Sequence, residues 1–111
     1  LIIGYAPCEM HGVKGGMTNC QAEMKKAVEA GYWNMFRFNP ALKAEGKNPF
    51  ILDSKPATGD YKEFISGETR YSRLKLAFPE RAEKLFDEAA QHAVDQYNFL
   101  VKLQTLYGTE E

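Results

Sequence analysis

The chain begins with an extended hydrophobic pattern and ends with a helical one. Residues 1–6 form a continuous apolar run with β-branched side chains, which is typical of a strand covered on both faces. Pro7 ends this run, and a glycine-rich loop follows at residues 11–17, where the backbone can turn sharply. The pattern therefore places Cys8 at the carboxyl end of a predicted buried strand.

A first helix is predicted directly after this loop. Thr18 and Gln21 have the spacing of a capping box, with Thr18 as the N-cap residue. Gly31 has the position of a C′ residue that ends the helix. Between these signals, apolar side chains repeat on one helical face: Cys20, Met24, Ala27 and Val28.

An aromatic run at residues 32–38 predicts a second strand, which Asn39 and Pro40 break. Strand, helix and strand in this order favour a right-handed parallel crossover. No basic patch accompanies the aromatic side chains, so buried strand packing is favoured over stacking on nucleic-acid bases. Arg37 is expected to pair with a carboxylate across an interface.

A third strand and a series of helices complete the pattern. After a polar connection at residues 41–48, a short strand is predicted at residues 50–52. Asp60 then has the position of an N-cap residue for a short helix that Gly67 ends. The fold class is thus predicted to be α/β, with a helical C-terminal extension.

The last helix carries a long apolar stripe. Pro79 is well placed in its first turn, and the stripe runs from Ala82 to about Tyr107. The predicted sheet is too small to cover a stripe of this length. We therefore expect it to pack on another part of a longer protein or on a second subunit.

Composition limits the classes of function. The chain has 111 residues, of which 44% are hydrophobic and 26% charged, as expected for at most one soluble globular domain. Its formal net charge of −1 gives no reason to expect nucleic acid or an anionic membrane as a partner. We see no apolar run near the ~20 residues of a membrane span and no signal peptide. The first residue is not Met, and we interpret the chain as a piece of a longer polypeptide.

Two cysteines, Cys8 and Cys20, limit the metal and redox chemistry. They are too few for a disulfide scaffold or for a complete zinc or iron–sulfur site, which usually takes ~4 protein ligands. A disulfide between them stays open as an alternative. A reducing cytoplasm is the favoured setting.

Cys8 is the strongest candidate for chemistry. A lone cysteine after a strand is commonly a small core residue, but a position behind Pro7 at a strand end favours a thiolate that serves as metal ligand or nucleophile. His11 lies three residues later and can hydrogen-bond either a sulfur or a loop carbonyl. Cys20 is predicted to be a packed helix residue, and His92 a solvent-exposed one.

Several strings of residues, taken together, resemble the C-terminal end of pyruvate:ferredoxin (flavodoxin) oxidoreductase. The first is Tyr5-Ala6-Pro7-Cys8 with His11-Gly12, and the others occupy residues 27–33, 37–40 and 48–54. The likeness continues through residues 59–64, 70–71 and 78–80, and it becomes weaker in the last helix. Several long strings in order are more specific than a single motif.

The resemblance implies a large, cytoplasmic, dimeric enzyme of anaerobic metabolism. That family decarboxylates pyruvate on thiamine diphosphate, with magnesium, and passes electrons through 4Fe-4S clusters to ferredoxin or flavodoxin. Acetyl-coenzyme A is the product. Residues 1–59 are then similar to the end of the α/β thiamine-diphosphate-binding domain, and residues 60–111 to its helical C-terminal extension.

The resemblance also implies a role for Cys8. In the family, the cysteine of the Pro-Cys string is the fourth ligand of the cluster nearest the thiamine, and the other three ligands come from outside this chain. His11 would then shape the surroundings of the cluster by hydrogen bonding. Cys20 matches no cluster position.

Two other functions stay open. One is a non-catalytic interaction module whose helical stripe docks a partner subunit. The other is a stand-alone thiol enzyme that uses Cys8 with His11.

Overall fold

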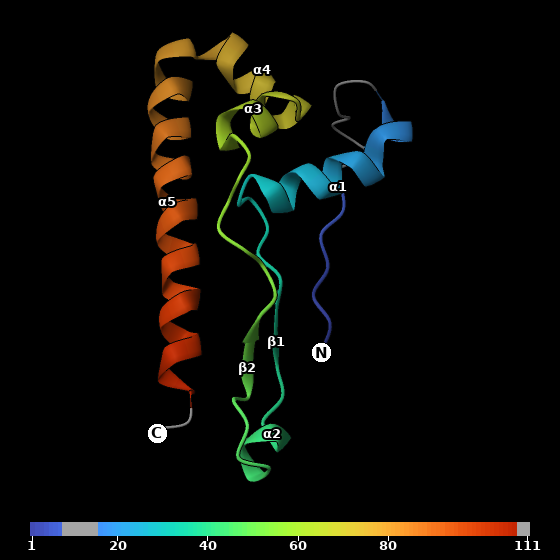
Figure 1. The fold of residues 1–111 in the computed structure, drawn as a ribbon. Helices are drawn as coiled ribbons and strands as arrows, with labels where there is room; N and C mark the ends of the chain where they lie inside the picture. The colour runs from blue at the N-terminus through green and yellow to red at the C-terminus, as the bar shows by residue number, and fades with distance from the viewer. Residues whose placement is uncertain (8–15, 109–111) are drawn as a thin grey trace.

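The computed structural model describes residues 1–7 and 16–108, which form an elongated molecule of 52 × 30 × 22 Å (Figure 1). The helix α5 (Pro79–Leu106) runs along one side for 28 residues, or about 42 Å. Shorter helices gather beside its first turns, and a narrow pair of strands lies beside its later turns. The fold class is therefore α/β, as predicted, with a small two-stranded sheet and a C-terminal helix.

Three short helices pack around a small core at one end of the molecule. They are α1 (Cys20–Glu29), α3 (Tyr61–Ser66) and α4 (Thr69–Ala77), and α1 lies across α3 in Figure 1. The residues of the core are almost closed to solvent: Ala27, Ala30, Phe64 and Ile65. Small side chains on α1 let it approach the larger side chains of α3 closely.

The helix α1 ends as predicted but begins differently. Asn19, and not Thr18, is the N-cap residue, and no side chain caps the first turn. The predicted capping box of Thr18 and Gln21 is therefore wrong, because a 3-10 turn at Met17–Asn19 takes up Thr18 before the helix starts. Gly31 follows the helix with φ +80°, the left-handed conformation expected of a C′ glycine.

The start of α3 follows the sequence prediction. Asp60 is the N-cap residue, and its Oδ1 accepts hydrogen bonds from the backbone N–H groups of Lys62 (2.9 Å) and Glu63 (3.2 Å). Gly67 is the C-cap residue. The N–H groups of Thr58 and Gly59 also donate to the Glu29 carbonyl, so the connection before α3 is fastened to the end of α1.

The sheet differs from the predicted topology. The strands β1 (Phe36–Phe38) and β2 (Phe50–Leu52) are antiparallel, with Arg37 opposite Ile51. The connection between them contains the short helix α2 (Ala41–Ala44). The third predicted strand is confirmed as β2. The parallel crossover predicted between residues 1–6 and 32–38 is wrong, because residues 1–6 form no strand and β1 pairs with β2 instead.

The first seven residues do not form the predicted strand. Residues 1–7 have no regular secondary structure, and Leu1, Ile2 and Ile3 are exposed. A strand depends on a hydrogen-bonded neighbour and on cover for its faces, and neither β1 nor β2 pairs with this segment. The run of apolar residues resembles a strand, but among the described residues no strand pairs with it.

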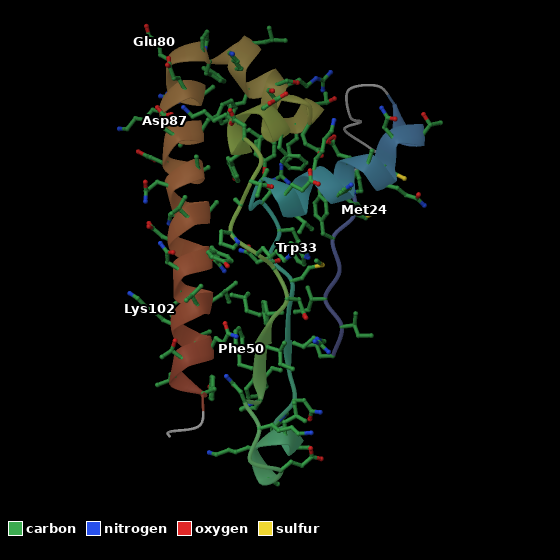
Figure 2. All side chains as sticks on the ribbon, in the orientation of Figure 1. Met24, Trp33, Phe50, Glu80, Asp87 and Lys102 are labelled. Atoms are coloured by element: carbon green, nitrogen blue, oxygen red, sulfur yellow. The ribbon has the colours of Figure 1, made fainter. Side chains whose placement is uncertain are left out.

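The long helix α5 joins the two ends of the molecule. It contacts α3 and α4 with its first turns and β2 with its later turns, and Ala82 and Leu100 are its buried residues. In Figure 2, Phe50 of β2 points toward α5, whereas Lys102 points away from the strands. Several apolar side chains of α5 stay exposed: Leu85, Val94, Phe99, Val101 and Leu106.

Within residues 1–7 and 16–108, no helix combines the length and the apolar character that crossing a membrane requires.

Candidate functional site

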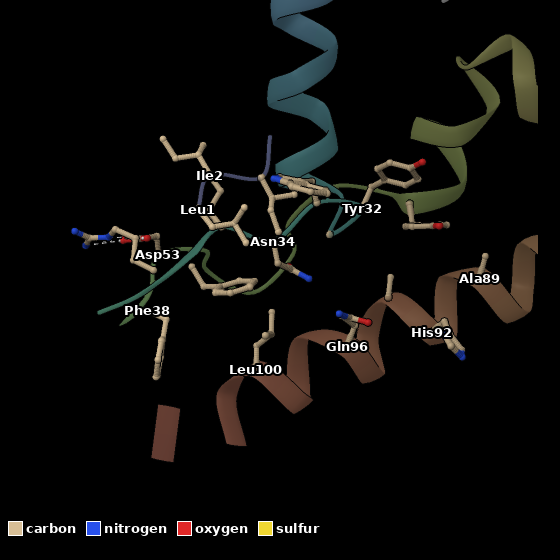
Figure 3. Close-up of a pocket in the computed structure, with 18 of the residues that line it drawn as sticks. Leu1, Ile2, Tyr32, Asn34, Phe38, Asp53, Ala89, His92, Gln96 and Leu100 are labelled. Carbon is tan, nitrogen blue, oxygen red and sulfur yellow. Dashed lines mark hydrogen bonds and ion pairs between the residues drawn. The ribbon is translucent and has the colours of Figure 1, made fainter. Parts of the chain in front are cut away.

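An open groove separates α5 from the extended segments beside it (Figure 3). Its volume is about 1310 Å³. One wall is the face of α5 from Leu85 to Leu100, and the opposite wall is made by residues 1–3 and 31–38. Figure 3 shows Ala89, Gln96 and Leu100 on the α5 side, facing the extended segments.

The lining of the groove is mostly apolar and aromatic, with polar side chains among them. Its described lining contains one histidine, His92, and no Ser, Thr, Cys or Lys. At its rim, Arg37 donates to both oxygens of Asp53, at 3.0 and 2.9 Å, and this hydrogen-bonded carboxylate raises the pKa of Arg37. The pair was expected across an interface, but it lies within the strand pair. An apolar groove of this kind is suited to packing.

A cluster of aromatic side chains closes the end of the groove near α3. The Tyr32 ring lies 5.0 Å from Phe64 and 5.6 Å from Tyr5, between ring centroids, and Tyr5 stacks on Trp33 at 5.8 Å. The hydroxyl oxygens of Tyr32 and Tyr71 are 2.9 Å apart. Burial raises the pKa of Tyr32, and the hydrogen bond with Tyr71 raises it further. The Tyr32 phenol therefore stays protonated at neutral pH, and either hydroxyl can donate the hydrogen bond that joins Tyr32 and Tyr71.

Two buried carboxylates lie against this cluster. Glu23 of α1 is 7% exposed and Glu68, between α3 and α4, is 6% exposed. The Tyr5 hydroxyl donates to Glu68 Oε1 at 3.3 Å. Burial raises the pKa of Glu68, the charge of Glu23 adds to this, and the hydrogen bond from Tyr5 acts in the opposite direction. Burial and the Glu68 charge in turn raise the pKa of Tyr5.

The two predicted site residues, Cys8 and His11, lie outside the described residues. The structure describes the segment just before them, residues 1–7, in which Tyr5 contacts the core cluster and Glu68. Cys20 is a half-buried free thiol on α1, as predicted for a packed helix residue. His92 is exposed on α5, as predicted, although it also lines the groove.

The buried carboxylates were missed by the sequence analysis. Glu23 is four residues before Ala27 and thus lies on the core-facing side of α1, so helical spacing could have indicated its burial. Glu68 has no such signal, because it stands between Gly67 and α4 at a helix boundary, where exposure is the usual outcome.

The described residues do not complete a metal centre. Among the described residues, no group of three or more His, Cys, Asp or Glu side chains could hold a metal ion. A 4Fe-4S cluster takes four thiolates, and the sequence contains two cysteines. Such a cluster therefore fits only if at least two of its ligands come from another part of a larger protein.

Comparison with known proteins gives a family for the chain. No family model matches it. It is 53% identical over 105 residues to a pyruvate:ferredoxin oxidoreductase of Moorella thermoacetica, which covers 92% of this chain and 9% of that protein. Pyruvate-flavodoxin oxidoreductases of Enterobacter agglomerans and Klebsiella pneumoniae are 48% and 45% identical, over 93% and 84% of this chain. The chain spans only 9% and 8% of those two relatives.

The strings of residues that suggested this family therefore belong to a similarity that extends over most of the chain. Identity at this level, over more than 90 residues in each comparison, establishes common ancestry for the matched region. The chain is homologous to a segment, about a tenth of the length, of the pyruvate:ferredoxin and pyruvate-flavodoxin oxidoreductases.

Proposed function

We propose that this chain is a C-terminal segment of a pyruvate:ferredoxin or pyruvate-flavodoxin oxidoreductase, in which it supplies one cluster ligand and packing surfaces. The observation that carries the proposal is the 53% identity to a relative so named, over 92% of this chain. Because the chain spans only 9% of that relative, decarboxylation of pyruvate and electron transfer need the rest of the enzyme. The segment alone is inactive.

Cys8 is the residue that we assign to the cofactor. Its thiolate is the fourth ligand of a 4Fe-4S cluster, and His11 lies close enough in sequence to hydrogen-bond the cluster or a ligand sulfur. When bound, such a cluster accepts electrons one at a time. Thiamine diphosphate, magnesium and coenzyme A are held by other parts of the cytoplasmic, dimeric enzyme.

The segment has two parts in this proposal. Residues 1–59 are the end of the thiamine-diphosphate-binding domain, and residues 60–111 are a helical extension. The exposed apolar side chains of Leu1, Ile2 and Ile3 support a place within a larger protein, because a strand-like apolar segment at the surface is suited to further polypeptide beside it.

The ligand assignment is tested in the full-length enzyme that contains this segment. Cys8→Ala should alter the electron paramagnetic resonance signal of the cluster nearest the thiamine and lower the rate of ferredoxin or flavodoxin reduction. Cys20→Ala is the matched control, because it removes the other thiol of the segment from a half-buried helix position. Unchanged cluster signals and unchanged acceptor reduction in Cys8→Ala would reject the assignment.

A packing role, in which the segment docks the rest of the enzyme or a second subunit, has its own support. The groove is lined mostly by apolar and aromatic side chains, and Leu85 at its margin is 47% exposed. Leu85→Lys should therefore weaken assembly or lower the melting temperature of the full enzyme. Lys102→Glu on the side of α5 away from the strands is the control. Native mass by light scattering and a native melting temperature in Leu85→Lys would contradict this role.

A further inference from the structure

We propose that Glu68 is a positioning residue, which holds Tyr5 and thereby fixes the segment that leads into Cys8. This inference rests on the proposed function of Cys8 as a cluster ligand. It concerns residues at the corner between α3 and α4, which lie far from Cys8 in the sequence.

Tyr5 is the anchor of the first described segment. Leu1, Ile2 and Ile3 are exposed, and residues 1–7 belong to no helix or strand. Tyr5 alone among them packs against the core cluster, where its ring meets Tyr32 and Trp33 and its hydroxyl donates to Glu68 Oε1 at 3.3 Å. The path of this segment therefore depends on one side chain and its partners.

The side chain of Glu68 contacts Tyr5 and does not cap the helix α4. It is the N-cap residue of α4, with φ −92° and ψ 119°, but its side chain makes no capping hydrogen bond. Its backbone is nevertheless fixed, because its carbonyl accepts from the N–H groups of Tyr71 and Ser72, each at 3.0 Å. The buried carboxylate instead meets a hydroxyl 63 residues away in the chain. A buried acceptor oxygen that lost this donor would be costly to leave unpaired.

The helix that follows Cys8 in the sequence rests on the same corner. Glu23 of α1 is buried, and its Oε2 lies 3.9 Å from the position that a Cβ would take at Gly67, next to Glu68. The segments on both sides of residues 8–15 are thus held at one place. Cys8 is three positions after Tyr5 in the sequence, a reach of at most about 11 Å, so the position of Tyr5 limits where the thiol can lie.

The test uses the full-length enzyme with Tyr5→Phe, which keeps the aromatic ring and removes the hydroxyl. Tyr97→Phe is the matched control, because its hydroxyl also makes one hydrogen bond, to the Ser54 carbonyl at 3.4 Å, at the other side of the molecule. Glu68→Ala removes the acceptor, and Glu68→Gln retains an oxygen that can accept from Tyr5. Two measurements are made on each variant: the midpoint potential of the cluster nearest the thiamine, and the alkylation rate of Cys8 in cluster-free enzyme, followed by peptide mass spectrometry.

We expect Tyr5→Phe and Glu68→Ala to increase the alkylation rate of Cys8 about fivefold, the factor for one lost net hydrogen bond, and to shift the midpoint potential. Glu68→Gln should restore both values toward those of the wild type, and Tyr97→Phe should change neither. Wild-type rates and potentials in Tyr5→Phe and Glu68→Ala overturn the inference.

This test of Tyr5 and Glu68 can fail or succeed independently of the test of Cys8 as a cluster ligand. If Cys8→Ala leaves the cluster intact, the ligand assignment fails, but the alkylation rates still report whether Tyr5 and Glu68 position the thiol. If Cys8→Ala disrupts the cluster and Tyr5→Phe has no effect on either measurement, the ligand assignment stands and the positioning role is rejected.

Discussion

The two ends of this molecule both contain aromatic side chains, but they use them differently. At the helical end, Phe64 is 4% exposed and Ile65 1% exposed, and Tyr32 lies 5.0 Å from Phe64. At the strand end, Phe36 stacks on Phe50 at 5.4 Å but stays 50% exposed. Three helices surround the first group, whereas the strand pair is covered mainly by α5. Within the strand pair, Phe50 is only 3% exposed, because β2 contacts α5, so burial follows the covering elements and not the residue type.

The difference also concerns polar groups. At the helical end, the buried Glu68 carboxylate accepts from Tyr5, and the hydroxyls of Tyr32 and Tyr71 are hydrogen-bonded to each other. The strand end has the Arg37–Asp53 pair at its surface. Buried polar contacts are expensive to break, and exposed ion pairs contribute little. We therefore expect changes at the helical end to have larger effects than changes at the strand end.

The largest difference is expected between Ile65→Ala and Phe38→Ala. Ile65 is the most fully buried large side chain among the described residues, so Ile65→Ala should lower the free energy of unfolding by about 3 kcal/mol. Phe38 is 51% exposed, and its removal should cost about 1 kcal/mol or less. Urea denaturation followed by circular dichroism measures both. Equal losses would show that the two ends share one core.

Alkaline pH should destabilise the helical end. The pKa values of Tyr5, Tyr32 and Tyr61 are raised, in each case first by burial. A folded-state pKa above the unfolded value of about 10 leaves stability unchanged below that pH, and stability is lost as the pH rises beyond it. Absorbance at 295 nm and circular dichroism, measured together against pH, test this. Ionisation of all six tyrosines near pH 10 with an unchanged helix signal would contradict it.

A smaller effect is expected from Asp60→Ala. The Asp60 side chain accepts two backbone hydrogen bonds at the start of α3, and the loss of an N-cap typically costs about 1 kcal/mol. Asp60→Asn should retain most of the stability, because it keeps an acceptor oxygen. Thermal melts of both variants measure this, and an equal fall in the melting temperature for Asn and Ala would argue against a capping role.

The smallest effect is expected from Arg37→Ala. The Arg37 guanidinium is exposed at the rim of the groove, so salt and water screen its attraction to Asp53. The variant should have nearly the wild-type melting temperature, and any difference should disappear as the salt concentration rises. A loss that persists in high salt would indicate that the pair contributes to packing of the strands and not only to charge.

The helix signals could be predicted because they are local. Asp60 and Pro79 mark helix starts and Gly31 marks a helix end, and the structure confirms all three. Thr18 was wrong, because a 3-10 turn competes with a capping box over the same few residues. The predicted strand at residues 1–6 failed for another reason, since a strand depends on a neighbour that local sequence cannot supply.

The candidate site was predictable only in part. The position of Cys8 behind an apolar run and Pro7 indicated a candidate thiol, and the strings of residues indicated the family that the comparisons confirm. Glu68 and its contact with Tyr5 could not be predicted, because 63 residues separate the two partners.

On its own, the sequence determined the end of α1, the starts of α3 and α5, the α/β class and the family. Tertiary structure alone decided that the two strands run antiparallel, that an open groove follows α5, and that Tyr5 meets a buried carboxylate. The physical reason is range: capping and helical periodicity act over a few residues, whereas strand pairing and burial depend on segments that come together only when the chain folds.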